Sequence, residues 1–253
     1  VFMAITNGPS IEIIIPVLDE EVDLPVCIER LIEFCSNHMS GYDWTITTAD
    51  NGSTDRTLEI ATELSDLNDR VGFIRLEERG RGRALKRAWT QSKADMVAYM
   101  DVDLSTGLDA LPRAADIVRS RMCDIAVGSR LIEGSQVTGR SIKREFISRS
   151  YSLLFRAMFF VSFRDAQCGF KVVSGKVIKK ILPLVKSNGW FFDTELLLLS
   201  EKNGYSVCEI PVRWTDDSDT RVKIFDTAWE DIKGLIRIRF GGLARARKIL
   251  SRK

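Results

Sequence analysis

The sequence predicts an α/β fold in which a Rossmann-like, doubly wound and mostly parallel sheet forms a single domain. Short apolar runs, many of them β-branched, recur along the first half of the 253 residues, and amphipathic segments with helical spacing separate them. No internal repeat and no low-complexity linker divides the chain. Strands that are apolar on both faces and alternate with helices are typical of a parallel sheet covered by helices on both sides.

The first strand and helix show this pattern most clearly. Residues 11–17 are an apolar run, and in the segment that follows Leu24, Ile28 and Leu31 fall on one helical stripe. The same alternation continues to residue 127. The expected strands are residues 11–17, 44–49, 71–76, 96–100 and 124–127, and the expected helices are residues 20–37, 54–64, 84–92 and 108–119.

The second half of the chain is less regular. Residues 140–163 are expected to form one or two helices with a wide apolar face, residues 191–201 another helix, and residues 207–214 another strand. Residues 232–253 contain no acidic residue and interleave Lys and Arg with Leu and Ile. We therefore expect one domain over residues 1–231, followed by a basic amphipathic C-terminal segment over residues 232–253.

The composition argues against several classes of function. Lys and Arg (37) barely exceed Asp and Glu (35), so the net charge of +2 does not indicate a nucleic-acid-binding protein. The five cysteines are scattered and form no CxxC pair, which disfavours a disulfide framework or a zinc site and favours a reducing compartment. His38 is the only histidine, which excludes histidine triads and multi-histidine zinc sites. No stretch reaches the roughly 18 apolar residues of a membrane span, so we expect a soluble or membrane-surface protein.

Polar residues follow several of the predicted strands. Open α/β sheets bind ligands outside the carboxyl ends of their strands, so residues 19–21, 50–55 and 101–103 are expected to face one crevice. Asp101 and Asp103 would point to the same side of an extended chain, about 7 Å apart. Such a pair suits Mg²⁺ or Mn²⁺, because these ions take one or two carboxylates and complete their shell with water and phosphate oxygens.

An Asp-x-Asp motif is short and occurs by chance, so its position relative to a strand decides whether it indicates a metal site. Residues 217–219 also read Asp-x-Asp, but only residues 101–103 follow an apolar strand. Residues 50–53 (DNGS) fit a strand-ending turn, and they equally fit an aspartate placed for a base or ribose beside a helix N-terminus. Residues 80–84 (GRGRA) are not a dinucleotide fingerprint, since they follow the third strand and lack the GxGxxG spacing.

Taken together, seven short motifs resemble family-2 glycosyltransferases of the GT-A fold. Among these the chain is similar to the polyprenyl-phosphate hexosyltransferases, which include the dolichyl-phosphate glucosyl- and mannosyltransferases. The motifs are residues 15–21 (IPVLDEE), 50–55 (DNGSTD), 80–84 (GRGRA), 100–105 (MDVDLS), 128–130 (GSR), 165–171 (DAQCGFK) and 190–197 (WFFDTELL). The last two, with residues 210–215 (IPVRWT), resemble the glucosyl branch more than the mannosyl branch.

The resemblance implies a role for each matching residue. On the donor side it implies nucleotide contacts from Pro16, Leu18, Glu20, Asp50, Asp101 and Val102, and metal contacts from Asp101, Asp103 and Ser105. Ser105 stands where some relatives carry glutamine, and Asn51 stands where members often carry a second aspartate. On the acceptor side it implies Arg130, with Asp103 among the catalytic residues. Because an arginine fork suits a phosphate, we expect Arg144 beside Arg130 as a catalytic residue, together with Arg221 or Lys223. Further candidate acceptor contacts are Gln167, Asp193 and Glu195, and the last two equally fit a structural role.

The implied reaction is inverting transfer of a hexose from a nucleotide sugar, UDP-glucose favoured, to a polyprenyl phosphate with the help of Mg²⁺ or Mn²⁺. A phosphate monoester is largely dianionic near neutral pH, so its attack needs no strong general base. Such an acceptor lies in a bilayer. We therefore expect a cytoplasmic protein that docks on the membrane face through the apolar part of residues 146–163 and the basic residues 232–253.

Other functions remain open at this point. GDP-mannose as donor, a soluble acceptor, and a non-catalytic sugar-nucleotide-binding module are the alternatives. Nucleic-acid binding by the basic segment is disfavoured, because Phe240 is its only aromatic residue and base stacking normally uses such rings.

Overall fold

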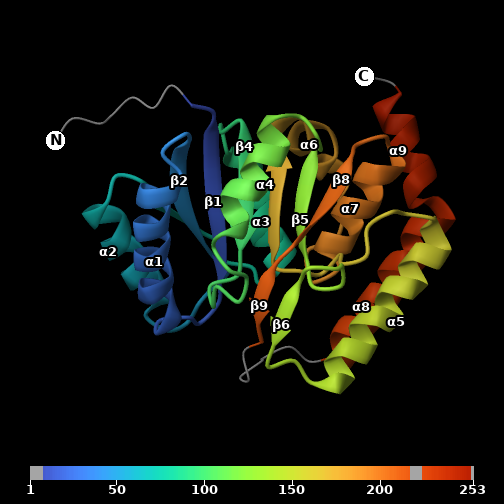
Figure 1. The fold of residues 1–253 in the computed structure, drawn as a ribbon, viewed down its shortest axis with the longest axis horizontal. Coiled ribbons are helices and arrows are strands. Elements are labelled where there is room, and N and C mark those ends of the chain that lie inside the picture. Colours follow the sequence, from blue (N-terminus) through green and yellow to red (C-terminus); the bar gives the residue numbers. More distant parts are fainter. Residues whose placement is uncertain (1–7, 217–223, 252–253) are drawn as a thin grey trace.

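The computed structural model describes residues 8–216 and 224–251, and it confirms the α/β fold (Figure 1). The central sheet has seven strands in the order β3-β2-β1-β4-β7-β5-β8. They are β1 (Ser10–Val17), β2 (Asp43–Asp50), β3 (Val71–Arg75), β4 (Met96–Met100), β5 (Ile125–Ser129), β7 (Phe170–Ser174) and β8 (Val207–Pro211). Every strand pair is parallel except the two that involve β7.

Helices cover both faces of this sheet (Figure 1). They are α1 (Asp23–His38), α2 (Thr57–Leu67), α3 (Arg81–Gln91), α4 (Ala110–Arg119), α5 (Ile142–Phe159), α6 (Gly175–Lys180), α7 (Phe192–Lys202), α8 (Ile224–Arg237) and α9 (Leu243–Leu250). Strand β1 shows why the sheet needs a layer of helices on each of its two faces. Ile13 and Ile15 belong to the apolar cluster beside α1 and α4, whereas Ile14 belongs to the cluster beside α3 and α7.

Strand β7 is the main difference from the sequence-based expectation. It runs antiparallel between β4 and β5, with Met100 opposite Phe170. This pairing brings the preceding loop against the end of β4, where the Asp101 N–H donates to the Gly169 carbonyl at 3.2 Å. The strand therefore carries residues of the second half of the chain into the site formed by the first half.

Smaller differences concern the C-terminal half. The expected strand over residues 207–214 is two strands, because the chain leaves β8 and continues as β9 (Arg213–Thr215), which pairs with β6 (Gln136–Thr138) in a separate sheet. Residues 140–163 contain one helix, α5 (Ile142–Phe159), whose Ser141 cap accepts a hydrogen bond from the Arg144 N–H. The expected domain boundary at residue 231 falls inside α8, and the segment beyond it buries Leu235, Ile238 and Ala246 in the core.

The cysteines differ from the expectation as well. Cys123 and Cys208 form a disulfide, with their Cα atoms 6.0 Å apart, while Cys27, Cys35 and Cys168 are free and buried. The pair is 85 residues apart in sequence and meets only because β5 and β8 are neighbours in the sheet. Linear spacing therefore gave no sign of it. None of the described helices combines the length and the apolar character needed to cross a bilayer.

Candidate active site

A cavity of about 630 Å³ opens at the carboxyl ends of β1 and β4, where the sequence predicts a crevice. Most of the residues expected on the donor and acceptor sides line it. They are Pro16, Leu18, Glu20, Asp101, Val102, Asp103, Ser105, Arg130, Arg144, Gln167 and Asp193. Asp50 and Glu195 do not line it, and Arg221 and Lys223 lie outside the described residues.

Asp50 is fully buried behind the cavity wall. Its Oδ2 pairs with Arg75 Nη1 at 2.7 Å, and its Oδ1 accepts from the Ser53 N–H at 3.1 Å. The neighbouring Asn51 lines the cavity instead, and its Oδ1 accepts from the Gly80 N–H at 2.7 Å. Asp50 thus holds the turn together, whereas Asn51 is the residue of this motif with access to a ligand.

The carboxylates of Asp101 and Asp103 lie on a turn rather than on an extended strand, because β4 already ends at Met100. The Leu104 N–H donates to the Asp101 carbonyl at 3.1 Å, and Leu104 has a left-handed backbone conformation (φ 49°). The Ser105 N–H donates to Asp103 Oδ1 at 2.9 Å. The alternation expected for a strand is therefore wrong here, and a tight turn places both carboxylates at the cavity.

Burial raises the pKa of Asp101, and the nearby Asp103 carboxylate adds to this effect, while Arg81 opposes it. A carboxylate whose charge is disfavoured by burial and by a second carboxylate beside it is suited to bind a cation. No cluster of three or more His, Cys, Asp or Glu side chains fit for a metal occurs among the described residues. The donor set fits an ion such as Mg²⁺ or Mn²⁺, which needs only one or two protein carboxylates when a substrate diphosphate supplies further oxygens.

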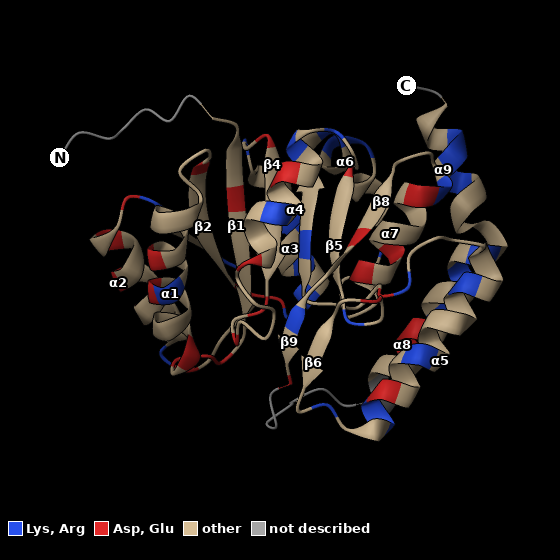
Figure 2. Cartoon of the chain, viewed as in Figure 1, with Lys and Arg blue, Asp and Glu red and all other residues tan. Residues whose placement is uncertain are grey.

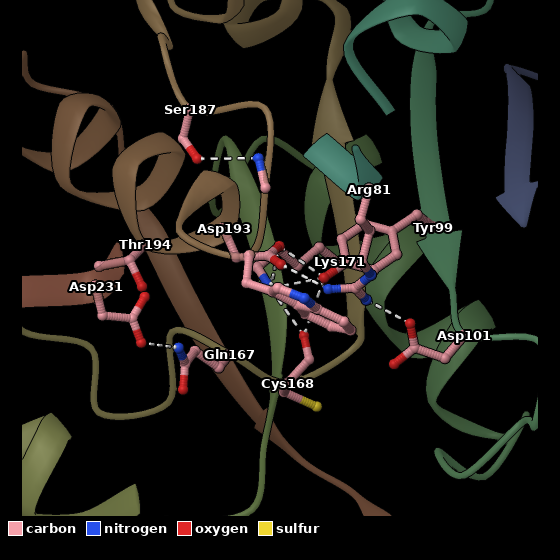
Figure 3. Close-up of polar contacts among 12 residues, drawn as sticks. Arg81, Tyr99, Asp101, Gln167, Cys168, Lys171, Ser187, Asp193, Thr194 and Asp231 are labelled. Atoms are coloured by element: carbon pink, nitrogen blue, oxygen red, sulfur yellow. Dashed lines mark hydrogen bonds and ion pairs between the residues drawn. The ribbon is translucent and has the colours of Figure 1, made fainter. Parts of the chain in front are cut away.

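Arg81, at the start of α3, is a site residue that the sequence analysis did not single out (Figure 3). Its Nη2 contacts Asp101 Oδ1, and its Nη1 donates to Asp193 Oδ2 at 3.1 Å. Burial disfavours its charge, but the carboxylates of Asp101 and Asp193 outweigh burial and raise the pKa of Arg81. The GRGRA motif was visible in the sequence, yet the partner of its arginine depends on how β4 and α7 pack.

Asp193 connects this contact to a buried group of polar side chains (Figure 3). Its Oδ1 accepts from the Tyr99 hydroxyl at 2.6 Å and pairs with Lys171 Nζ at 2.9 Å. Lys171 is fully buried and also donates to the Cys168 carbonyl at 2.8 Å. Asp193 therefore lies on the cavity wall and pairs with two cations, Arg81 and Lys171.

Three arginines line another part of the cavity. Arg130 binds the buried Asp165 in a fork, with Nε–Oδ2 and Nη2–Oδ1 distances of 2.8 and 2.9 Å. Burial opposes the charge of Asp165, but Arg130 outweighs it and lowers the pKa of that carboxyl. Arg144 Nη1 donates to Asp216 Oδ1 at 2.6 Å. These carboxylates fix the direction of both guanidinium groups.

The third arginine, Arg140, was not predicted from the sequence. Its side chain is 8% exposed, and its Nη2 donates to Ser148 Oγ. Its Nη1 lies 3.1 Å from Glu145 Oε2 but makes no hydrogen bond within the described parts of the chain. Burial lowers the pKa of Arg140, and the like charge of Arg130 lowers it further. A buried cation next to a second cation is a favourable place for an anion.

The remaining predicted residues have structural partners. Gln167 lines the cavity and donates through Nε2 to Asp231 Oδ2 at 2.7 Å, which ties the cavity wall to α8. Glu195 is buried on α7, where its Oε2 accepts from the Ser187 N–H at 2.7 Å and from Arg237 Nη2 at 2.8 Å. Glu195 thus holds α7, α8 and the loop that precedes α7 together.

Comparison with known proteins identifies the family of this chain. The model of the family "Glycosyl transferase family 2" matches residues 12–182. Glycosyltransferase AglD of Haloferax volcanii is 32% identical over 222 residues, which are 87% of this chain and 35% of that protein. The dolichyl-phosphate beta-glucosyltransferase of Dictyostelium discoideum is 26% identical over 252 residues, covering 95% of this chain and 77% of that enzyme. The chain therefore spans only about a third of the length of AglD.

Among solved structures, glucosyl-3-phosphoglycerate synthase from Mycobacterium tuberculosis, in complex with Mn²⁺, UDP and phosphoglyceric acid, has the same fold. Its TM-score is 0.69 at 14% identity, over 92% of this chain and 79% of that one. This likeness confirms the GT-A architecture. Because the family model matches more than half of its length, the chain belongs to glycosyl transferase family 2.

Proposed function

We propose that this protein transfers a hexose from a nucleotide sugar, with UDP-glucose as the favoured donor, to a polyprenyl phosphate. One observation carries the proposal. A single cavity is lined both by the carboxylates of Asp101 and Asp103 and by the guanidinium groups of Arg130, Arg140 and Arg144. The first group suits a metal-bound diphosphate, and the second suits an acceptor phosphate.

The donor side uses the ends of β1 and β4. Asp101 and Asp103 would hold Mg²⁺ or Mn²⁺, with Ser105 beside them, and the ion would stabilise the charge of the departing diphosphate. Pro16, Leu18 and Asn51 line the cavity around the nucleotide. Asp50 contributes indirectly, because its bonds to Arg75 and Ser53 shape the turn that presents Asn51.

The acceptor side uses the arginines. Arg130 and Arg144 are already oriented by Asp165 and Asp216, so little rotamer freedom is lost when they bind a phosphate. The phosphate oxygen attacks the anomeric carbon opposite the leaving diphosphate, which inverts the configuration. Asp193 is not a base in this scheme, because both of its oxygens are engaged by Arg81, Tyr99 and Lys171.

A bilayer acceptor requires a docking surface, and two helices offer one. On α5 the exposed apolar residues Ile142, Phe146 and Leu153, with Phe160 at the C-cap, recur at spacings of four and seven. On α8 and just beyond it, exposed Trp229, Ile232, Ile236 and Phe240 recur at spacings of three and four. We call these sets the α5 stripe and the α8 stripe.

Both helices lie at the same end of the molecule, and Lys and Arg mark α5 and α9 there (Figure 2). We propose that the stripes enter the interface of the cytoplasmic membrane face while these cations contact anionic lipid.

The proposal is tested by product analysis. Purified protein is incubated with a polyprenyl phosphate and either UDP-glucose or GDP-mannose, with and without Mn²⁺. The lipid product is identified from its mass by mass spectrometry. We expect a glucosylated lipid phosphate that requires Mn²⁺ or Mg²⁺, and we expect Asp103→Asn to lose it. Asp69→Asn is the matched control, since Asp69 is exposed and does not line the cavity.

Each alternative has its own result in this experiment. A mannosylated product from GDP-mannose would replace the donor assignment. Transfer to 3-phosphoglycerate but not to the lipid would replace the acceptor assignment. Stabilisation by UDP and Mn²⁺ without turnover of any donor would instead indicate a binding module.

A further inference from the structure

Arg81 makes a contact that the proposed function does not yet explain. Its guanidinium binds Oδ1 of Asp101, the carboxylate that we propose as a metal ligand (Figure 3). A guanidinium and a divalent cation on one carboxylate repel each other, and the guanidinium occupies one of the two oxygens that the ion could use. The two cations therefore compete for Asp101.

The guanidinium of Arg81 lies between two aromatic rings and beside the cavity. Its guanidinium carbon lies 4.8 Å from the ring centre of Trp190 and 5.2 Å from that of Tyr99. Both Trp190 and the flanking Gly80 line the cavity, as Arg81 itself does. A guanidinium that moves along these ring faces keeps its cation–π contacts while its N–H groups turn from Asp101 towards the cavity.

The charge of Asp193 stays balanced when Arg81 moves, because a second cation contacts this carboxylate. It is 2% exposed, so it needs a cation nearby whether or not Arg81 stays in contact. Lys171 supplies that cation at 2.9 Å, and the Tyr99 hydroxyl donates to the same oxygen. Asp193 can therefore keep Arg81 as a tether through Oδ2 without depending on it for charge balance.

The start of α3 is itself fixed, so any movement belongs to the side chain. A Cβ at Gly82 would lie 2.6 Å from Phe192 Cβ and 2.9 Å from the Gly189 carbonyl oxygen, which shows how closely α3 packs against α7 and its preceding loop. The Arg83 N–H also donates to the Asn188 carbonyl at 3.1 Å. The backbone of Arg81 is thereby held close to α7, which carries Asp193.

We propose that Arg81 is an exchangeable counter-ion of Asp101, which the donor diphosphate draws away so that the divalent cation can bind. The inference rests on the proposed metal-and-diphosphate site. It gives Arg81 two partners in turn, the Asp101 carboxylate and then a diphosphate oxygen, to which its fork of N–H donors is well matched. The metal then binds strongly only together with the nucleotide, which prevents the site from holding an ion without its substrate.

The test measures metal binding without catalysis. Mn²⁺ affinity is measured by electron paramagnetic resonance, with and without UDP, for the wild type and for Arg81→Gln. We expect Arg81→Gln to bind Mn²⁺ alone at least about tenfold more tightly and UDP–Mn²⁺ at least about tenfold more weakly, a loss of about 1.4 kcal/mol. The two affinities thus change in opposite directions, which general damage to the site does not produce.

Arg79→Gln is the matched control. Arg79 lines the same cavity two residues earlier, but its Nη2 lies 3.6 Å from Asp19 and not beside Asp101. We expect this variant to leave the affinity for Mn²⁺ alone within about twofold of the wild type. Arg81→Lys keeps the charge and serves if Arg81→Gln does not fold; we expect it to bind Mn²⁺ alone no more tightly than the wild type.

The outcomes separate the inference from the function on which it rests. Equal or weaker binding of Mn²⁺ alone to Arg81→Gln, with UDP–Mn²⁺ still binding to the wild type, overturns the inference only. Equal tightening of Mn²⁺ binding in Arg79→Gln also overturns it, because the effect would then be the general loss of a positive charge. Failure of Mn²⁺ to bind any variant, with or without UDP, overturns both the inference and the proposed metal site.

Discussion

Gly169 determines how closely the chain can approach Asp101. A Cβ at position 169 would overlap the Asp101 carboxylate, and the Gly169 carbonyl accepts from the Asp101 N–H. We expect Gly169→Ala to displace this carboxylate and to weaken UDP–Mn²⁺ binding by at least about tenfold, or about 1.4 kcal/mol. Thermal stabilisation by UDP and Mn²⁺ measures the effect.

Gly72→Ala is the comparison for this variant, because a Cβ there meets only Thr47 Oγ1 at 3.9 Å, an ordinary contact. It should keep the full stabilisation by UDP and Mn²⁺. Undiminished stabilisation of Gly169→Ala would show that Asp101 does not need its observed position.

Asp231 predicts a pH-dependent stability. Burial raises its pKa to about 7, the Glu230 carboxylate adds to this, and the Gln167 hydrogen bond opposes it. Because the folded-state pKa is raised, the neutral side chain contributes stability below about pH 4, and this contribution is lost as the pH rises through about 7. We expect Asp231→Asn, which keeps an acceptor for Gln167, to raise Tm at pH 8 by at least about 3 °C.

At pH 5 the gain in Tm from the same variant should be clearly smaller than at pH 8, because Asp231 is then still neutral in the folded protein and only its unfolded-state carboxyl is ionised. Asp66→Asn replaces an exposed carboxylate on α2 and should not change the pH dependence. Scanning fluorimetry over this pH range checks both variants. An equal gain from Asp231→Asn at pH 5 and pH 8 would mean that its titration does not govern stability.

Individual residues also show where sequence reasoning stops. Asp101 and Arg130 stood out because each follows an apolar strand and belongs to a motif. Arg81 and Arg140 acquire their significance from partners about 20 residues away or more, or from burial beside a like charge, so spacing could not reveal them. Asp50 and Asn51 are adjacent, and only the path of the turn decides which of them faces the cavity.

At the scale of elements, the α5 and α8 stripes predict membrane binding. Phe146→Asp together with Trp229→Asp places a charge in each stripe at positions that are 72% and 60% exposed. We expect the double variant to lose most of its co-sedimentation with anionic vesicles, because burial of two large aromatic side chains is worth about 3–6 kcal/mol. Leu67→Asp, at an exposed leucine on α2, is the matched control and should bind as the wild type does.

Folding is monitored in the same experiment, since exposed positions tolerate a charge with changes of about 0.5 kcal/mol or less in stability. Unchanged vesicle binding of a well-folded double variant would remove the docking role of both stripes.

The elements also show which parts of the fold were predictable. Strands β1 and β4 were found almost to the residue, because their apolar runs are nearly continuous and are buried on both faces of the sheet. Strand β2 was found equally well from its alternation of buried and exposed residues, which is typical of a strand with one covered face. Strand β7 was not found, although four of its five residues are buried. It directly follows the QCG segment that reads as a loop, and its position between β4 and β5 depends on pairing across more than 40 residues of sequence.

At the scale of the whole molecule, the C-terminal segment combines stability with docking. Residues 232–253 were expected to be an appendage, but Ile238 and Ala246 are buried in the same apolar cluster as α3 and α7. Arg245, Arg247 and Lys248 on α9 are exposed. Figure 2 shows the colour of Lys and Arg along this helix. Deleting the segment would therefore confuse two effects that point substitutions can separate.

We expect the triple substitution of Arg245, Arg247 and Lys248 by Gln to weaken binding to anionic vesicles, because each cation near the surface contributes about 1 kcal/mol. Its Tm should stay within about 2 °C of the wild type, since solvent-exposed substitutions change stability by about 0.5 kcal/mol or less. Ala246→Asp should do the reverse by placing a charge in the core, and it should lower Tm by more than about 5 °C. Vesicle flotation at low and high salt, with melting curves, separates the two, because only the electrostatic part of binding is screened. A triple variant that binds vesicles as well as the wild type at low salt would leave the apolar stripes alone to hold the protein at the membrane.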